Sequence, residues 1–161
     1  PTTKGYPPSV FGMLAQLLER PGTSPHGTIT AFFSVLVEAD DMNDPIGDSV
    51  RSILDGHIVL SRELAEANHY PAIDVLMSIS RLMSEVATPE QAEAAGRLKE
   101  LLSVYRHAED LVNVGAYVPG SNPRIDEALR KMEAIRSFLK QRPNEVSDMG
   151  ETLRRLNEVV A

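Results

Sequence analysis

Apolar residues in the second half of the chain recur every three to four positions, the spacing of one face of an α-helix. Three such stretches follow one another, over about residues 89–114, 123–141 and 147–160. Glycine and proline within 115–123 and 142–144 separate the stretches, and both residue types end helices. The pattern predicts a small bundle of three helices.

The first half of the chain alternates helical and strand-like patterns. Residues 27–37 are rich in Ile, Thr, Phe and Val and predict a strand that is buried on both faces. A second, shorter strand is expected over 57–60. The helices predicted around these strands are one opened by 7–9 with Ser9 as a possible cap, one over 44–54, and one capped by Ser61 that reaches 67. This order predicts a parallel sheet with crossover helices. Because two strands do not make a free-standing sheet, we expect the rest of it to come from upstream sequence or from another chain.

The two patterns meet near residue 88. Thr88, followed by Pro89 and Gln91, has the spacing of a capping box with proline in the first helical position. The predicted fold class is therefore α/β plus α, with part of an α/β domain over residues 1–87 and a helical bundle over 88–161.

Composition narrows the function classes. The chain has 161 residues, a formal net charge of −7 and no cysteine, which excludes disulfides, thiolate metal sites and cysteine nucleophiles. The acidic balance argues against nucleic acid as a partner, because there is no basic excess to displace phosphate counterions. No apolar run reaches the ~18 residues of a membrane helix, and no signal peptide is visible. A first residue that is proline rather than methionine leads us to expect a processed, truncated or partial chain.

No catalytic motif can be identified from spacing alone. The four histidines have no mutual spacing typical of a metal site, and His57 is expected to be structural. The acidic residues within 38–48 could be a cation site, but we favour a solvated loop with acids that cap a helix. A phosphate-cradling GxxxxGK[ST] loop is absent from the sequence. The residues alone therefore indicate half an α/β domain joined to a helical bundle.

Six runs of residues, in this order and at these spacings, are similar to the C-terminal part of the protein-export ATPases. They are 4–11 (KGYPPSVF), 27–32 (GTITAF), 35–45 (VLVEADDMNDP), 52–62 (SILDGHIVLSR), 68–76 (NHYPAIDVL) and 78–83 (SISRLM). These ATPases drive flagellar assembly and type III secretion and are relatives of the catalytic subunits of rotary ATP synthases. The run 114–126 resembles the flagellar branch more than the injectisome branch.

The resemblance implies a RecA-like P-loop ATPase domain and assigns two site residues. Arg81 matches the family's arginine finger, which reaches the γ-phosphate of a neighbouring subunit and stabilises transition-state charge. Tyr70 matches the position whose ring packs on adenine. The alternatives are a surface arginine at position 81 and a core tyrosine fixed by Pro71 at position 70. The Walker A loop, the catalytic Glu and the Walker B Asp would lie upstream of Pro1, so we expect this chain to be inactive alone.

The sequence departs from the rotary synthases in two places. Arg142 and Pro143 stand where a synthase has a second adenine-binding aromatic, which predicts a base held on one side and looser nucleotide selectivity. The turn 116–122 contains no acid, whereas the matching synthase turn is strongly acidic and contacts the rotor. Both departures favour an export ATPase. By the same resemblance, residues 4–8 are expected to face the pore of a ring, although a plain proline-rich turn is the alternative.

The resemblance also implies a cofactor, partners and a location. ATP with Mg would be bound mainly by the upstream part of the protein. The expected partners are five further copies in a homo-hexamer, a central stalk protein, export substrates and chaperones on the helical domain, and indirectly the membrane export gate. The expected location is cytoplasmic, at the inner face of the export apparatus. The alternatives are an injectisome ATPase and a docking module without catalysis.

Overall fold

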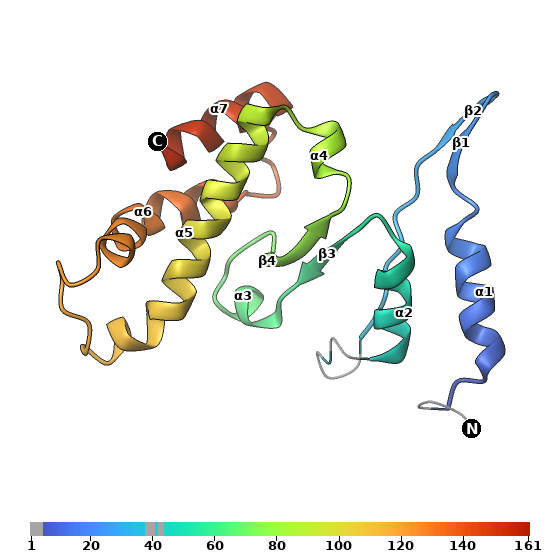
Figure 1. Cartoon of the computed structure of the whole chain (residues 1–161), viewed down its shortest axis with the longest axis horizontal. Coiled ribbons are helices and arrows are strands. Elements are labelled where there is room, and N and C mark those ends of the chain that lie inside the picture. Colours follow the sequence, from blue (N-terminus) through green and yellow to red (C-terminus); the bar gives the residue numbers. More distant parts are fainter. Residues whose placement is uncertain (1–4, 38–40, 42–43) are drawn as a thin grey trace. The chain divides into compact units, whose positions relative to one another are not determined.

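The computed structural model describes residues 5–37, 41 and 44–161, and it divides the chain into two compact units, Pro1–His57 and Ile58–Ala161. The first unit contains α1 (Pro8–Leu18), the strands β1 (Gly22–Ser24) and β2 (Gly27–Ile29), and α2 (Pro45–Ile53). Helices α1 and α2 lie against each other, and β1 and β2 form an antiparallel hairpin that pairs Gly22 with Ile29 (Figure 1).

The strand expected over 27–37 is the main error of the sequence analysis. Only Gly27–Ile29 is a strand, all three of its residues are exposed, and Phe32 and Leu36 are 92% and 96% exposed. Among the described residues, the stretch 30–37 has no neighbouring strand to receive its backbone hydrogen bonds, and β-structure needs such a neighbour. The apolar pattern of 30–37 is thus typical of a buried strand, but the described residues of this chain do not bury it.

Side-chain caps explain where the other helices begin. Asp44 accepts hydrogen bonds from the backbone N–H groups of Ile46 and Gly47 at 3.1 and 3.2 Å, as expected for an acid that caps α2. Ser61 caps α3 (Arg62–Glu66) through the Leu64 N–H, so both predicted caps are confirmed. Ser9 is not a cap, since α1 begins at Pro8 and its N-cap residue, Pro7, makes no side-chain bond.

The second unit combines a strand pair with the predicted helices. β3 (Gly56–Leu60), which begins at the end of the first unit, pairs with β4 (Ile73–Ser80), and α4 (Met83–Val86) follows β4. The helices of the bundle are α5 (Pro89–Asn113), α6 (Pro123–Leu139) and α7 (Met149–Val160), each within two residues of its expected bounds. Thr88 accepts a hydrogen bond from the Gln91 N–H at 3.2 Å, which confirms this half of the predicted capping box.

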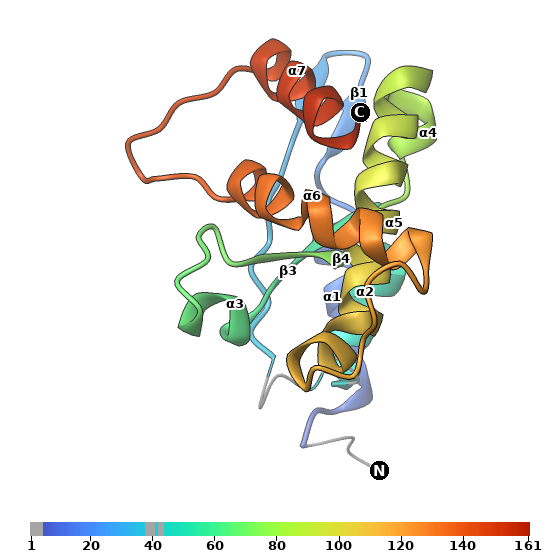
Figure 2. The ribbon, with the colours of Figure 1, turned by 90° about the vertical axis from the view of Figure 1, so that its left-hand side faces the viewer.

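The core of the second unit lies between α5, α6 and α7, which cross one another (Figure 2). The buried side chains that form it are those of Ala94, Leu98, Leu101, Ala128, Met132, Ile135 and Leu156. Val75 of β4 packs against this cluster, so the strand is attached to the bundle. Across the part of the chain that the structure describes, no helix combines the length and the apolar character needed to cross a membrane.

Candidate functional site: a hollow beside Tyr70

Tyr70 lies in the connection between α3 and β4, on a segment that is held at both ends. The backbone N–H of the preceding residue, His69, donates to the Leu64 carbonyl at 2.8 Å. The Tyr70 carbonyl accepts a hydrogen bond of 2.8 Å from the backbone N–H of Gln141, beyond the end of α6. Tyr70 itself is 52% exposed. The alternative of a core tyrosine is therefore wrong, and the ring is available for contact.

An open hollow of about 1000 Å³ lies beside Tyr70. Residues from four places line it: the 68–70 segment, Tyr105 on α5, the stretch from Leu129 on α6 to Glu145, and Arg155 on α7. Arg142 and Pro143 are among the lining residues. The structure therefore brings Tyr70 together with Arg142 and Pro143, which stand where a rotary synthase has its second adenine-binding aromatic.

Basic side chains dominate the rim of this hollow. The guanidinium of Arg136 lies 5.0 Å from the centre of the Tyr105 ring and donates to the Tyr105 hydroxyl at 3.1 Å. Arg155 lies 5.7 Å from the centre of the Phe138 ring and pairs with Glu145 at 3.5 Å. The lining holds four basic side chains, those of Arg136, Lys140, Arg142 and Arg155, against the carboxylates of Glu133 and Glu145, so its charge balance is positive.

The pKa of His69 is affected by both its burial and the positive charges of this lining. Burial, and then the positive charges of Lys140 and Arg136, lower the pKa of His69 below its ordinary range. The residue is only 8% exposed, which agrees with burial as the first cause. A neutral imidazole next to Tyr70 is the consequence at neutral pH.

We expect this histidine to make the chain less stable in mild acid. The unfolded chain binds a proton at His69 with an ordinary pKa near 6.5, whereas the folded chain resists it, so stability is lost as pH falls from about 7.5 to 5.5. Urea denaturation at both pH values should show a smaller loss for His69→Gln than for the unsubstituted chain. His107→Gln, at an exposed histidine of α5, is the matched control. An unchanged pH dependence in His69→Gln would contradict the assignment.

Arg81 lies far from this hollow along the same strand. It is exposed and follows directly after β4, whereas Tyr70 precedes β4 by three residues. The eight-residue strand between them is roughly 23 Å long from its first to its last residue, at a rise of about 3.3 Å per residue. The two residues are therefore at opposite ends of β4 and are not brought together within one chain.

β4 is also joined to the bundle by an ion pair. Asp74 accepts hydrogen bonds from the backbone N–H groups of Leu76 and Met77 at 2.9 and 3.0 Å. Both of its carboxylate oxygens accept from Nη2 of Arg106 on α5 at 3.1 Å. The Asp74 side chain is 14% exposed and the Arg106 side chain 49%, so solvent screens the pair in part. The strand that carries Tyr70 and Arg81 at its two ends is thus tied to α5.

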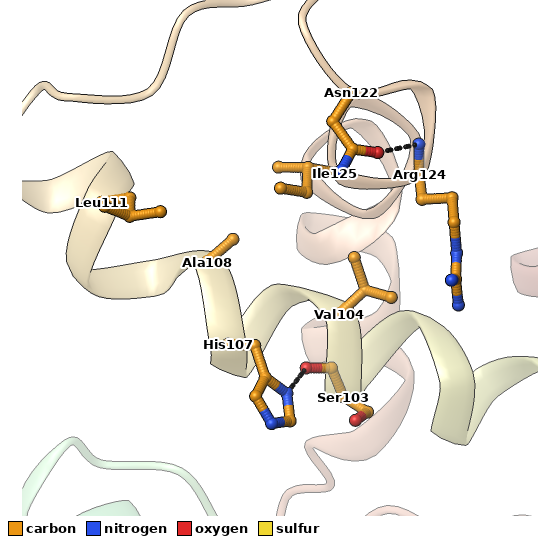
Figure 3. Close-up of a pocket in the computed structure, with 8 residues that line it drawn as sticks. All are labelled: Ser103, Val104, His107, Ala108, Leu111, Asn122, Arg124 and Ile125. Atoms are coloured by element: carbon orange, nitrogen blue, oxygen red, sulfur yellow. Dashed lines mark hydrogen bonds between the residues drawn. The ribbon is translucent and has the colours of Figure 1, made fainter.

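The turn between α5 and α6 is ordered by one carboxylate. Asp126 accepts from the Tyr117 hydroxyl at 2.9 Å and from the Gly120 N–H at 3.0 and 3.1 Å. The turn carries exposed apolar side chains, with Val114 and Val118 at 76% and 66% exposed. A pocket of about 320 Å³ lies next to it, between the second half of α5 and the start of α6 (Figure 3). Val104, Ala108 and Leu111 line it from α5 and Ile125 from α6, as Figure 3 shows.

Two other predicted features are only partly within the described residues. In the proposed pore segment 4–8, Gly5 and Tyr6 are exposed, and residue 4 lies outside the described residues. Of the acidic stretch 38–48, Asp44 is the cap of α2 and Asp48 pairs with Arg51 at 3.2 Å. In the described part of the chain, no three His, Asp or Glu side chains are grouped as metal ligands.

Sequence reasoning missed His69, Tyr105 and Arg136 as neighbours of Tyr70. His69 lies in a loop, Tyr105 belongs to the apolar face of α5, and the position of Arg136 in α6 does not distinguish it from an ordinary surface residue. The available signal was the motif at 68–71, which places His69 beside Tyr70. The contacts across more than sixty residues come only from tertiary packing.

Two family models match the chain, one over its first half and one over its helical second half. The nucleotide-binding domain of the ATP synthase alpha/beta family matches residues 1–80, and the T3SS EscN ATPase C-terminal domain matches residues 87–158. The chain belongs to the ATP synthase alpha/beta family, and its sequence and fold match the C-terminal part of the flagellar and type III secretion members of that family. The resemblance and the fold class predicted above are confirmed.

Individual relatives come from both branches of that class. The chain is 53% identical to the Flagellum-specific ATP synthase of Bacillus subtilis and 51% identical to the Type 3 secretion system ATPase of Xanthomonas euvesicatoria; each match covers 99% of the chain and 36% of the relative. The chain thus spans about a third of the length of these curated relatives. The assembled ATPase EscN of enteropathogenic E. coli matches 100% of the chain and 39% of its own length, with a TM-score of 0.95 and 49% identity. EscN in complex with its central stalk EscO matches with a TM-score of 0.87.

Proposed function

We propose that this chain is the C-terminal part of an ATPase that works as a hexameric ring and energises flagellar protein export by ATP hydrolysis. The observation that carries this proposal is the placement of Tyr70 and Arg81 at opposite ends of β4. In a ring of identical subunits, one end of the strand can serve the chain's own nucleotide while the other end serves the neighbour's. The proposal explains why both residues are exposed in a single chain.

In this proposal Tyr70 holds the base and Arg81 acts on the neighbouring nucleotide. The hollow fits the base end of ATP, since it offers an exposed aromatic ring on which a base can stack. Base–aromatic stacking contributes about 1–3 kcal/mol per base. Mg with the phosphates would be held mainly by upstream residues, which also carry the phosphate loop and the catalytic carboxylate. Arg81 would place its guanidinium against the γ-phosphate across the subunit interface and stabilise the charge that develops there.

We further propose a cytoplasmic location at the inner face of the export apparatus, with a central stalk protein, export substrates and chaperones as partners of the helical domain. The exposed apolar turn at 114–122 supports the stalk contact, because it lies at one end of α5 and contains no acidic residue. A stalk that binds an apolar turn would be gripped differently from a synthase rotor. The export gate would be reached indirectly, through these partners.

Two alternatives have specific support. An injectisome ATPase is favoured by the 51% identity to a Type 3 secretion system ATPase, close to the value for the flagellar relative. A docking module without catalysis is favoured by the exposed apolar turn at 114–122.

A chimera tests the proposal and separates the alternatives. Residues 1–161 would replace the matching third of the Bacillus subtilis flagellar relative, and ATP turnover and motility would be measured in a strain that lacks the native protein. We expect both to be retained, whereas the isolated chain should neither hydrolyse ATP nor bind it tightly. A chimera that hydrolyses ATP without restoring motility favours the injectisome branch. A folded chimera without turnover, or turnover by the isolated chain, contradicts the proposal.

A further inference from the structure

The loop that follows α6 is joined to Tyr70 at its first residue and is closed by hydrogen bonds between its own two ends. Gln141 donates its backbone N–H to the Tyr70 carbonyl at 2.8 Å and its side-chain Nε2 to the Glu145 carbonyl at 3.0 Å. The Arg142 N–H donates to Oε2 of Glu145 at 3.1 Å. The backbone position of Arg142 relative to Tyr70 is thus set before any ligand arrives.

The arginines around the hollow differ in what they contact. Arg136 is stacked on Tyr105 and paired with Glu109 at 3.6 Å, and Arg155 is held by Phe138 and Glu145. The side chain of Arg142 lines the same hollow, yet it has no hydrogen bond, ion pair or ring contact with any described residue. Glu145, the nearest carboxylate in the loop, is already used by the Arg142 backbone and by Arg155. The guanidinium of Arg142 is therefore the one arginine group of this lining that is open to a ligand.

A planar guanidinium is suited to the second face of a base. Bases stack on arginine planes as well as on aromatic rings, and the N–H groups of arginine donate to the acceptor atoms on purine edges. Lys140 also lines the hollow, but an ammonium has no plane to stack. Stacking does not distinguish adenine from guanine, and a donor group finds acceptors on both, most fully on guanine O6 and N7.

We propose that Arg142 is a specificity-determining residue that contacts the purine opposite Tyr70, so that the site accepts ATP and GTP with similar efficiency. This inference rests on the proposed function, because it assumes that the hollow binds the base of a nucleoside triphosphate. The sequence analysis predicts a base that is held on one side only. In this proposal the base instead lies between the ring of Tyr70 and the guanidinium of Arg142.

The test measures kcat/KM of the full-length protein with ATP, with GTP and with ribose 5-triphosphate, which lacks a base. For Arg142→Ala we expect a loss of about 5- to 10-fold for ATP and GTP, through KM, and no change for ribose 5-triphosphate. Arg142→Lys should show the same loss, since it keeps the charge but not the plane. Arg130→Ala, at an exposed arginine of α6 outside the hollow, should change none of the values.

Tyr70→Ala separates failure of this inference from failure of the proposed function. If Tyr70→Ala lowers kcat/KM for ATP but not for ribose 5-triphosphate, while Arg142→Ala has no effect, the base site stands and the role of Arg142 is wrong. If neither substitution discriminates between the two substrates, the base site itself is wrong. Equal losses on ATP and ribose 5-triphosphate in Arg142→Ala, or full activity of Arg142→Lys, would overturn the stacking role. A preference for ATP over GTP of more than about 100-fold would overturn the shared selectivity.

Discussion

Arg81→Ala is expected to lower kcat for ATP hydrolysis by the full-length protein by roughly 10³- to 10⁵-fold, the range found for arginine fingers. Its Kd for ATP should stay within a few-fold of the unsubstituted value. The reason is geometric, because Arg81 follows the end of β4 that lies roughly 23 Å from the segment carrying Tyr70. A group at that distance contributes little to holding the chain's own nucleotide, and it acts only where charge develops in the transition state of the neighbouring site. Steady-state turnover and equilibrium nucleotide binding are the two measurements required.

Mixed rings show whether Arg81 acts across the subunit interface. Arg81→Ala subunits would be combined with subunits whose phosphate loop has been disabled, neither of which hydrolyses ATP alone. Some interfaces in such rings join an intact Arg81 to an intact phosphate loop, so partial activity should return. Arg62→Ala, at the first residue of α3, is the control and should keep most turnover. A loss of ATP binding in Arg81→Ala equal to its loss of turnover would indicate a folding defect instead.

The helices of this chain could be predicted from sequence because their signals are local. Asp44, Ser61 and Thr88 each cap a helix within three residues of their own position, and apolar periodicity fixed the extent of α5, α6 and α7. Strands depend on neighbours that are distant in sequence. The stretch 30–37 has the composition of a buried strand and yet forms none here, whereas β4 is a strand that periodicity did not reveal. Its partner β3 and the packing of Val75 against the bundle supply what the local pattern lacks.

The identification of Tyr70 and Arg81 as site residues depended on the family resemblance far more than on residue spacing. A tyrosine before a proline and an arginine after a strand are common, and neither would be singled out without the motifs around them. The surroundings of Tyr70 could not be predicted at all, because they are assembled by a backbone bond from Gln141 and by side chains on the facing surfaces of α5 and α6. The substitution of Arg142 and Pro143 for an aromatic was visible in the sequence. The lack of a contact to the Arg142 side chain required the structure.

Leu101→Ala is expected to produce the largest loss of stability in the helical bundle. Leu101 is 2% exposed and, with Ile135, is one of the largest fully buried side chains. It lies on α5 within the cluster that α6 and α7 complete, so shortening its isobutyl side chain to a methyl group leaves a cavity that three helices enclose. Buried leucine-to-alanine substitutions cost about 2–5 kcal/mol, and a site enclosed on all sides cannot easily collapse. Urea denaturation of the 161-residue chain, followed by circular dichroism, should show this decrease as a lower midpoint with an unchanged slope.

Leu111→Ala gives a matched control on the same helix. Leu111 lies ten residues further along α5 and is 51% exposed, so the same change in side chain removes far less buried area. We expect a loss of about 1 kcal/mol or less. The two variants separate burial from helix propensity, which changes equally in both and favours alanine. Equal losses in the two variants would mean that the buried contacts of α5 with α6 and α7 do not hold this helix in place.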